Sequence, residues 1–398
     1  MMMKNAGIIW LLCLLMAYLA SCTKPSPSSN SETAPATTDA PAVVPPADGN
    51  GIFKYTITTD FNVKSDDIDI LVAMNSVSGQ YPVKYDLDCE GDGKFEKIGL
   101  TDDVKCVYKK NTGKHQIWVR GEIPTMFLCA KRREDIDCGP DVPKEKLITC
   151  DLPLRDDHSA KAVVSIDSWG NIPWKSMAYF AAECEALNKL PEDSPDLSQV
   201  SDMNDMFYKA SSFNQPLENW NVSKVTNMVR VFYDAAAFNQ PLEKWNVSNV
   251  TNMARVFHEA VSFNQPLEKW NVSKVTKMAG MFFCASSFDQ PLEKWNVSNV
   301  ADMSWMFTRA SLFDQPLEKW NVSNVTDMSD MFHKAVIFNQ PLDKWDVSKV
   351  ENMDDMFNGA EAFSYYPKDW VVPAGYTDDM FNGTKVEEEA WKSPLKKK

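Results

Sequence analysis

The densest group of possible metal ligands in the chain is a run of acidic residues in its first third. Four carboxylates are closely spaced in the segment 85–93 (YDLDCEGDG): Asp86, Asp88, Glu90 and Asp92. Carboxylates grouped in this way are the oxygen ligands that Ca²⁺ prefers. The EF-hand loop does not fit, because its twelfth position is Lys97 when counted from Asp86 and Gly99 when counted from Asp88. Two interpretations remain, a weak calcium site and a polar turn in which aspartate side chains cap backbone amides, and we favour the turn.

Cysteine is the second reactive residue type. Seven of the 9 cysteines lie beyond the N-terminal segment: Cys89, Cys106, Cys129, Cys138, Cys150, Cys184 and Cys284. Seven is an odd number, so at least one thiol stays unpaired within the chain or pairs between chains. No CxxC or HxxxH spacing occurs, so a zinc site has little support and we expect no metal. The insertion 129–160 holds three cysteines and is expected to be a loop stapled by one disulfide, whose pairing the sequence does not determine.

The residue types of acid–base and nucleophilic catalysis do not form a recognisable set. The histidines are scattered along the chain: His115, His158, His258 and His333. No Ser/His/Asp or Cys/His constellation can be assembled around them. We therefore expect a protein that is not an enzyme.

Residues 51–128 carry the pattern of a small all-β domain. Apolar and polar residues alternate in short segments such as 53–57 and 116–119, and Gly, Asp and Asn separate these segments. Such alternation predicts strands with one buried face, and about 80 residues suit a β-sandwich. A sandwich would place the strands of Cys89 and Cys106 side by side, so we expect a disulfide between them.

Tryptophan recurs every 25 residues in the second half of the chain. The series is Trp220, Trp245, Trp270, Trp295, Trp320, Trp345 and Trp370. Nearly the same text, FNQPLEKWNVSNVTNM with small variations, surrounds each of the first six. A constant period of this length predicts a stack of small units, each of which buries its apolar face against its neighbours.

Each unit is expected to be a short strand, a turn and a short helix. Trp220 and Val222 are two residues apart and would share one face of the strand, with Asn221 on the other face. A stripe at helical spacing follows, with Thr226 as its N-cap: Val225, Met228, Val231, Phe232 and Ala235. The fold expected for residues 161–386 is therefore an α/β solenoid with caps, preceded by the small all-β sandwich. Its first coil places Cys184 at a small core position, as a buried thiol.

The N-terminus resembles the export signal of a bacterial lipoprotein. Leu19-Ala20-Ser21-Cys22 follows an apolar run and resembles the lipobox, in which the chain is cut before the cysteine. The resemblance implies that residues 1–21 are a signal peptide and that Cys22 is lipidated; an ordinary signal peptide or an anchor helix is the alternative. Residues 22–50 are rich in Pro, Ser, Thr and Ala, which predicts a disordered tether.

The repeats resemble the BspA-like family of bacterial leucine-rich-repeat surface proteins. The text WNVSNVTDM and the preceding segment SIDSWGNIPWKSM carry the resemblance, which covers about residues 162 to 385. It implies a leucine-rich-repeat-like, right-handed stack, a surface location, no enzymatic activity and no cofactor. The segment 85–93 and the later TGKHQIWV resemble PKD-like bacterial surface domains, although His115 takes the usual aromatic position.

A net charge of -14 argues against nucleic acid as a partner, and residues 387–398 are only a short charged tail. We expect a lipoprotein of the bacterial cell envelope, in the outer membrane or at the surface, that contacts the membrane through its lipid. Its repeats would bind an extracellular protein or glycan through a polar row: Asn221, Asn246, Asn271, Asn296 and Asn321. The alternative is a structural envelope protein that assembles with copies of itself, for which Cys284 could bridge two chains. The sequence determines neither the ligand nor the oligomeric state.

Overall fold

The computed structural model describes residues 51–60, 67–74, 83–128, 161–372, 379–386 and 396–397. All of these residues belong to one compact unit, Pro46–Lys398. The signal peptide, Cys22, the insertion 129–160 and most of the tail 387–398 lie outside the described residues. Among those that are described, no helix is long and apolar enough to cross a membrane.

Two antiparallel sheets form the β domain. The first has the order β4-β3-β6-β1-β8, and the second has the order β5-β2-β7. The strands of the first sheet are β1 (Ile52–Thr58), β3 (Lys84–Asp88), β4 (Lys97–Leu100), β6 (Lys114–Glu122) and β8 (Val163–Ser168). Those of the second are β2 (Asp67–Met74), β5 (Val104–Lys109) and β7 (Met126–Phe127), and a separate parallel pair joins β9 (Val371–Val372) to β10 (Lys396–Lys397).

Alternating side chains build the core of this domain. On β1 the buried residues are Phe53, Tyr55 and Ile57, and the residues between them are partly exposed. Tyr55 lies opposite Ile117 of β6 in the antiparallel register. Apolar residues on one face of each strand therefore meet in a shared interior, as a period of two requires.

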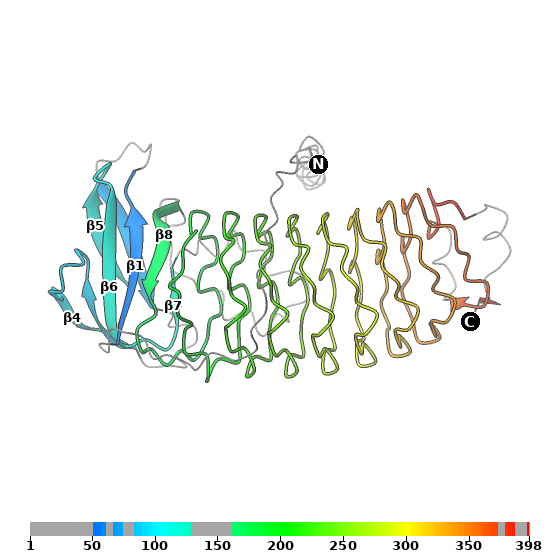
Figure 1. Cartoon of the computed structure of the whole chain (residues 1–398), viewed down its shortest axis with the longest axis horizontal. Coiled ribbons are helices and arrows are strands. Elements are labelled where there is room, and N and C mark those ends of the chain that lie inside the picture. Colours follow the sequence, from blue (N-terminus) through cyan, green and yellow to red (C-terminus); the bar gives the residue numbers. More distant parts are fainter. Residues whose placement is uncertain are drawn as a thin grey trace, which may run out of the picture. The chain divides into compact units, whose positions relative to one another are not determined.

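The β domain and the repeats are joined through β8. One edge of this strand pairs with β1, and on its other edge Ser165 forms a parallel bridge with Lys189 at the start of the repeats. Phe53 of β1 packs edge-on against Trp174 and Phe180, with ring centroids 5.6 and 6.0 Å apart. The two parts consequently share one continuous hydrophobic core. Figure 1 shows the coils of the repeats following one another from β8 onward.

The prediction of an α/β solenoid with short helices is wrong. Between Lys175 and Trp370, a range that the structure describes completely, no residue is helical and the expected strand at 220–222 is absent. Neighbouring coils are connected instead by single parallel bridges, one per coil, such as Asn227 with Asn252. The chain outside the β domain is therefore a stack of turns and bridges, for which we use the term repeat stack.

The positions of the expected helix form consecutive turns. The N–H groups of Val231, Tyr233 and Ala235 donate to carbonyls three residues earlier, rather than four as in an α-helix. The intervening N–H groups donate to the next coil: Met228 to Asn252, Arg230 to Ala254 and Phe232 to Val256, at 2.9–3.0 Å. Because half of the backbone donors are committed between coils, the segment cannot be a helix.

Two residues in each coil adopt the left-handed backbone region, which explains this course. In the coil of Met228 they are Arg230 (φ 54°) and Asp234 (φ 52°). A side chain there costs about 1–2 kcal/mol relative to the right-handed region. The inter-coil hydrogen bonds compensate for that cost, for example from the Asp234 N–H to the His258 carbonyl at 2.7 Å.

Identical residues stack as ladders through the core. Phe232, Phe257 and Phe282 lie nearly parallel, with successive centroids 5.6 and 5.7 Å apart. The indole N–H of each central tryptophan donates to a leucine carbonyl of the preceding coil, as Trp270 does to Leu242 at 2.9 Å. The ladders hold the coils in register although no continuous sheet exists.

Candidate functional site

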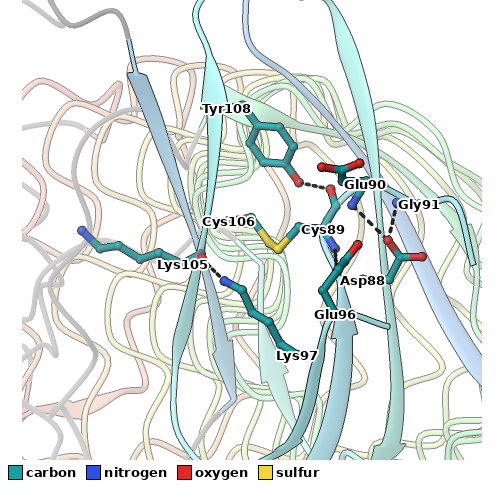
Figure 2. The surroundings of a disulfide bond; sticks show 9 residues. All are labelled: Asp88, Cys89, Glu90, Gly91, Glu96, Lys97, Lys105, Cys106 and Tyr108. Atoms are coloured by element: carbon teal, nitrogen blue, oxygen red, sulfur yellow. Dashed lines mark hydrogen bonds between the residues drawn. A yellow bond between two sulfur atoms is a disulfide. The ribbon is translucent and has the colours of Figure 1, made fainter. Parts of the chain in front are cut away.

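The acidic turn after β3 is organised around one buried carboxylate. Asp88 is fully buried and accepts the N–H groups of Glu90 and Gly91 on one oxygen and that of Gly93 on the other, at 2.6–3.0 Å. Figure 2 shows Asp88 beside the disulfide, with two of these hydrogen bonds. Both oxygens are therefore occupied by backbone donors, as in a capped polar turn.

The other acidic residues of the run do not converge on Asp88. Asp86 accepts the N–H of Gly99 and pairs with Arg120 at 3.0 Å, and these donors lower the pKa of Asp86. Asp92 pairs with Lys94 at 2.7 Å, which lowers the pKa of Asp92. Only Asp88, Asp92 and Glu96 have carboxylate oxygens within 4.8 Å of one another. The turn thus has the geometry of a structural cap, and the four residues singled out in the sequence do not form one calcium cage.

Cys89 and Cys106 form a disulfide, the pairing favoured from the sequence. The bond connects the end of β3 in the first sheet to β5 in the second, and the Tyr108 hydroxyl donates to the Cys89 carbonyl (Figure 2). Burial raises the pKa of Tyr108, so this donor stays protonated.

Cys184 is buried and disulfide-bonded, so the prediction of a buried free thiol at this position is wrong. The pairing within 129–160 lies outside the described residues.

The five asparagines of the expected ligand-facing row are all exposed at equivalent positions. Each accepts the N–H of the serine two residues later through its side-chain oxygen, at 3.1–3.2 Å. These contacts are Asx turns within single coils. Within the described residues, the Nδ2 groups of this row form no hydrogen bond, so they present amide donors to solvent once per coil.

A row of ion pairs runs beside these asparagines. Each lysine that precedes a core tryptophan pairs with a glutamate of the preceding coil, as Lys269 does with Glu243 at 3.2 Å and Lys294 does with Glu268 at 3.1 Å. The lysine side chains are about 70% exposed, so the pairs contribute little to stability. Their effect is to hold charged groups in line along the asparagine row.

A different asparagine row holds the coils together. Asn239 accepts the N–H of Asn264 at 2.9 Å and the Gln265 side-chain amide at 3.0 Å, both from the next coil. The equivalent residue makes the same pair of contacts in most coils, and aspartate replaces asparagine at 289 and 314. Repeat spacing alone did not distinguish this stabilising row from the outward row, because both recur every 25 residues.

The two left-handed positions and their neighbours are where the repeats differ most from one another. Asp205 and Arg230 form a buried ion pair there, with Oδ1 and Nε 2.8 Å apart. Further along, Asp330, His333 and Asp355 have possible ligand atoms within 4.8 Å of one another and could hold a metal ion. Burial, together with the Asp355 carboxylate, raises the pKa of Asp330, and burial lowers that of His333. The sequence carried no separate signal for this group, because Asp355 belongs to the next coil and is 25 residues from Asp330 and 22 from His333.

Two overlapping segments, residues 175–293 and 278–392, match the model of a protein family described as "Mycoplasma protein of unknown function, DUF285". Together they cover more than half of the 398 residues and nearly all of the repeat stack. No curated protein and no solved structure matches the chain.

Proposed function

The chain belongs to the family described as "Mycoplasma protein of unknown function, DUF285", and we propose that it is a non-enzymatic binding protein of a bacterial cell surface. The family description assigns no activity, so the proposal depends on the geometry of the repeat stack. The proposal also draws on the resemblance of the repeats to BspA-like surface proteins, and it includes a lipid anchor at Cys22. The ligand would be an extended glycan or an extracellular protein chain.

The observation that carries the proposal is the row of exposed amide donors at equivalent positions. Each asparagine of the row uses its oxygen to close a turn and leaves its Nδ2 group available. Neighbouring coils lie close together beside this row, where the Trp245 and Trp270 ring centroids are 6.4 Å apart. Carbonyl or hydroxyl oxygens repeated along an extended partner could then be bound by several coils at once. Weak contacts on one rigid scaffold add steeply, because each further contact is intramolecular.

The chain itself supplies the substitution that tests this row. In the sixth coil Asp346 replaces asparagine and still accepts the Ser348 N–H at 3.0 Å. Aspartate therefore preserves the turn and removes the amide donor. The purified full chain is first screened against glycan and matrix-protein arrays. The triple variant Asn246→Asp, Asn271→Asp, Asn296→Asp should then lose at least about tenfold in affinity for the ligand found, with an unchanged melting temperature.

Two controls separate binding from folding and from charge. The single variant Asn271→Asp should bind almost as well as the parent, because the remaining coils keep their donors. Repeating the measurement at high salt removes simple repulsion by the added carboxylates. A triple variant that binds as tightly as the parent would refute a role for this row in recognition.

A further inference from the structure

One row of the repeat stack carries charges whose order reverses about its centre. The row is the second left-handed position of five successive coils: Asp234, Glu259, Cys284, Arg309 and Lys334. Two acids precede the cysteine and two bases follow it. The core ladders repeat along the stack, whereas this row changes sign at Cys284 and carries one further base, Lys209, one coil before Asp234.

The backbone holds the five residues in register. Each of their N–H groups donates to a carbonyl of the next coil at 2.7–2.8 Å: Asp234 to His258, Glu259 to Phe283, Cys284 to Thr308, Arg309 to His333 and Lys334 to Asn358. All five have φ between 52° and 58°, so their side chains leave the backbone in the same way. The Tyr233, His258 and Phe283 rings beside the row stack with successive centroids 4.3 Å apart, so the row is evenly spaced there.

These side chains are accessible from solvent. The Glu259 side chain is 42% exposed, Lys334 is exposed, and the other three are half-buried. Beside the centre of the row, Phe283 stacks on His258 with ring centroids 4.3 Å apart. Aromatic residues and arginine are enriched at protein interfaces, and Phe283 and Arg309 both lie near the centre of the row.

Like charges lie next to one another in both halves of the row. Asp234 and Glu259 are one coil apart, as are Arg309 and Lys334. Neighbouring like charges at this spacing are destabilising. Burial and, to a smaller extent, the charge of Glu259 raise the pKa of Asp234 to about 6, while Lys209 acts in the opposite direction. Within one copy, the hydrogen bond to His258 and, after it, the charges of Lys209 and Arg309 lower the pKa of Glu259, so a dimer would add to compensation that the chain already provides in part.

We propose that this row is the contact surface of a homodimer in which two copies of the chain pack antiparallel about a two-fold axis at Cys284. Such an axis places Glu259 against Arg309 of the partner subunit and Asp234 against Lys334 of the partner subunit, each pair formed twice. Contacts of this kind are isologous and close on themselves, so they produce a dimer rather than a filament. The proposal is independent of the asparagine row and of its ligand.

Other alignments of two copies are less favourable. A parallel alignment in register would place Glu259 against its own equivalent and Arg309 against its own equivalent. In an antiparallel alignment displaced by one coil, Cys284 faces Arg309 of the partner subunit. The contact between Glu259 and Lys334 of the partner subunit then joins opposite charges, and Asp234 has no base opposite it. Three coils from the centre the complementarity ends, since Lys209 would meet Gly359. The matched region therefore extends over five coils.

Charge reversal in the purified full chain tests the proposal. Arg309→Glu creates two repulsive contacts with Glu259 in the dimer and should raise the dimer dissociation constant at least about tenfold in sedimentation equilibrium. Adding Glu259→Arg to the same chain restores opposite charges and should recover most of that loss. Lys274→Glu makes an equal charge change at an exposed residue outside the row and should leave the dissociation constant unchanged.

Cross-linking at the axis provides a second readout. A short bis-maleimide should join two copies through Cys284, and Cys284→Ser should abolish that product. Arg309→Glu should slow the reaction, and the double reversal should restore its rate. A chain that stays monomeric at all accessible concentrations would overturn the proposal. So would a dimer that Arg309→Glu leaves unchanged, because that result would locate the contact elsewhere.

Discussion

Replacing tryptophan by phenylalanine at two equivalent positions tests how the core ladder is stabilised. Trp270 and Trp370 are both almost fully buried, at 3% and 2% exposure. The indole N–H of Trp270 donates to the Leu242 carbonyl at 2.9 Å. That of Trp370 has no acceptor among the described residues. Phenylalanine removes the N–H group at both sites and preserves an aromatic ring.

The two losses should differ because the hydrogen bonding differs. At Trp270 the loss of a buried hydrogen bond lowers the free energy of unfolding by about 1 kcal/mol. The loss of packed apolar area lowers it by about 1 kcal/mol more, and the small void left by the smaller ring adds to this. We expect a destabilisation of about 2–3 kcal/mol. At Trp370 a similar or smaller packing loss is offset by removal of an unsatisfied buried donor, which costs about 1–3 kcal/mol. We expect Trp370→Phe to be neutral or slightly stabilising.

Urea unfolding followed by far-UV circular dichroism measures the two free energies. Repeat proteins can unfold from one end, so hydrogen exchange of the amides in 345–370 is recorded for the same variants. The difference between the sites should exceed about 2 kcal/mol. Equal losses at Trp270 and Trp370 would show that the indole hydrogen bond contributes nothing, and would refute the reasoning.

Three further predictions concern charge, backbone and anchoring, the first two measured below the concentration at which the chain associates. Asp234 binds its proton more tightly in the folded state, with a pKa of about 6, so its contribution to stability is complete below about pH 4 and is lost as the pH rises through 6. After discounting for solvent screening we expect a decline of about 1–2 kcal/mol, which Asp234→Asn should abolish in melting curves against pH. Lys334→Gly should raise the free energy of unfolding by about 0.5–1 kcal/mol, because φ is 55° there, whereas Lys319→Gly on the ordinary backbone should lower it. Cys22→Ala should release the protein from membranes and prevent labelling by palmitate; a variant that still incorporates palmitate would contradict lipidation at Cys22.

Residue spacing located the core of the repeats correctly. The tryptophans, Phe232 and Met228 are buried as their period requires, and Asn221 is exposed. The same spacing led to a wrong backbone. Apolar residues at intervals of three and four fit a helix stripe, but they also fit a chain of turns whose alternate N–H groups bind the next coil. Hydrophobic pattern alone cannot separate these two, because both bury the same side chains.

The sequence by itself determined the period, the residues that face the interior and the favoured cysteine pair of the β domain. Each of these follows from the identity and spacing of residues along the chain. Only the tertiary structure decided where the backbone donors go, because a hydrogen bond between coils depends on a residue 24 positions away and on left-handed φ values that side chains such as Arg230 do not favour. For the same reason only the structure distinguished the asparagines that close local turns from those that bind the next coil.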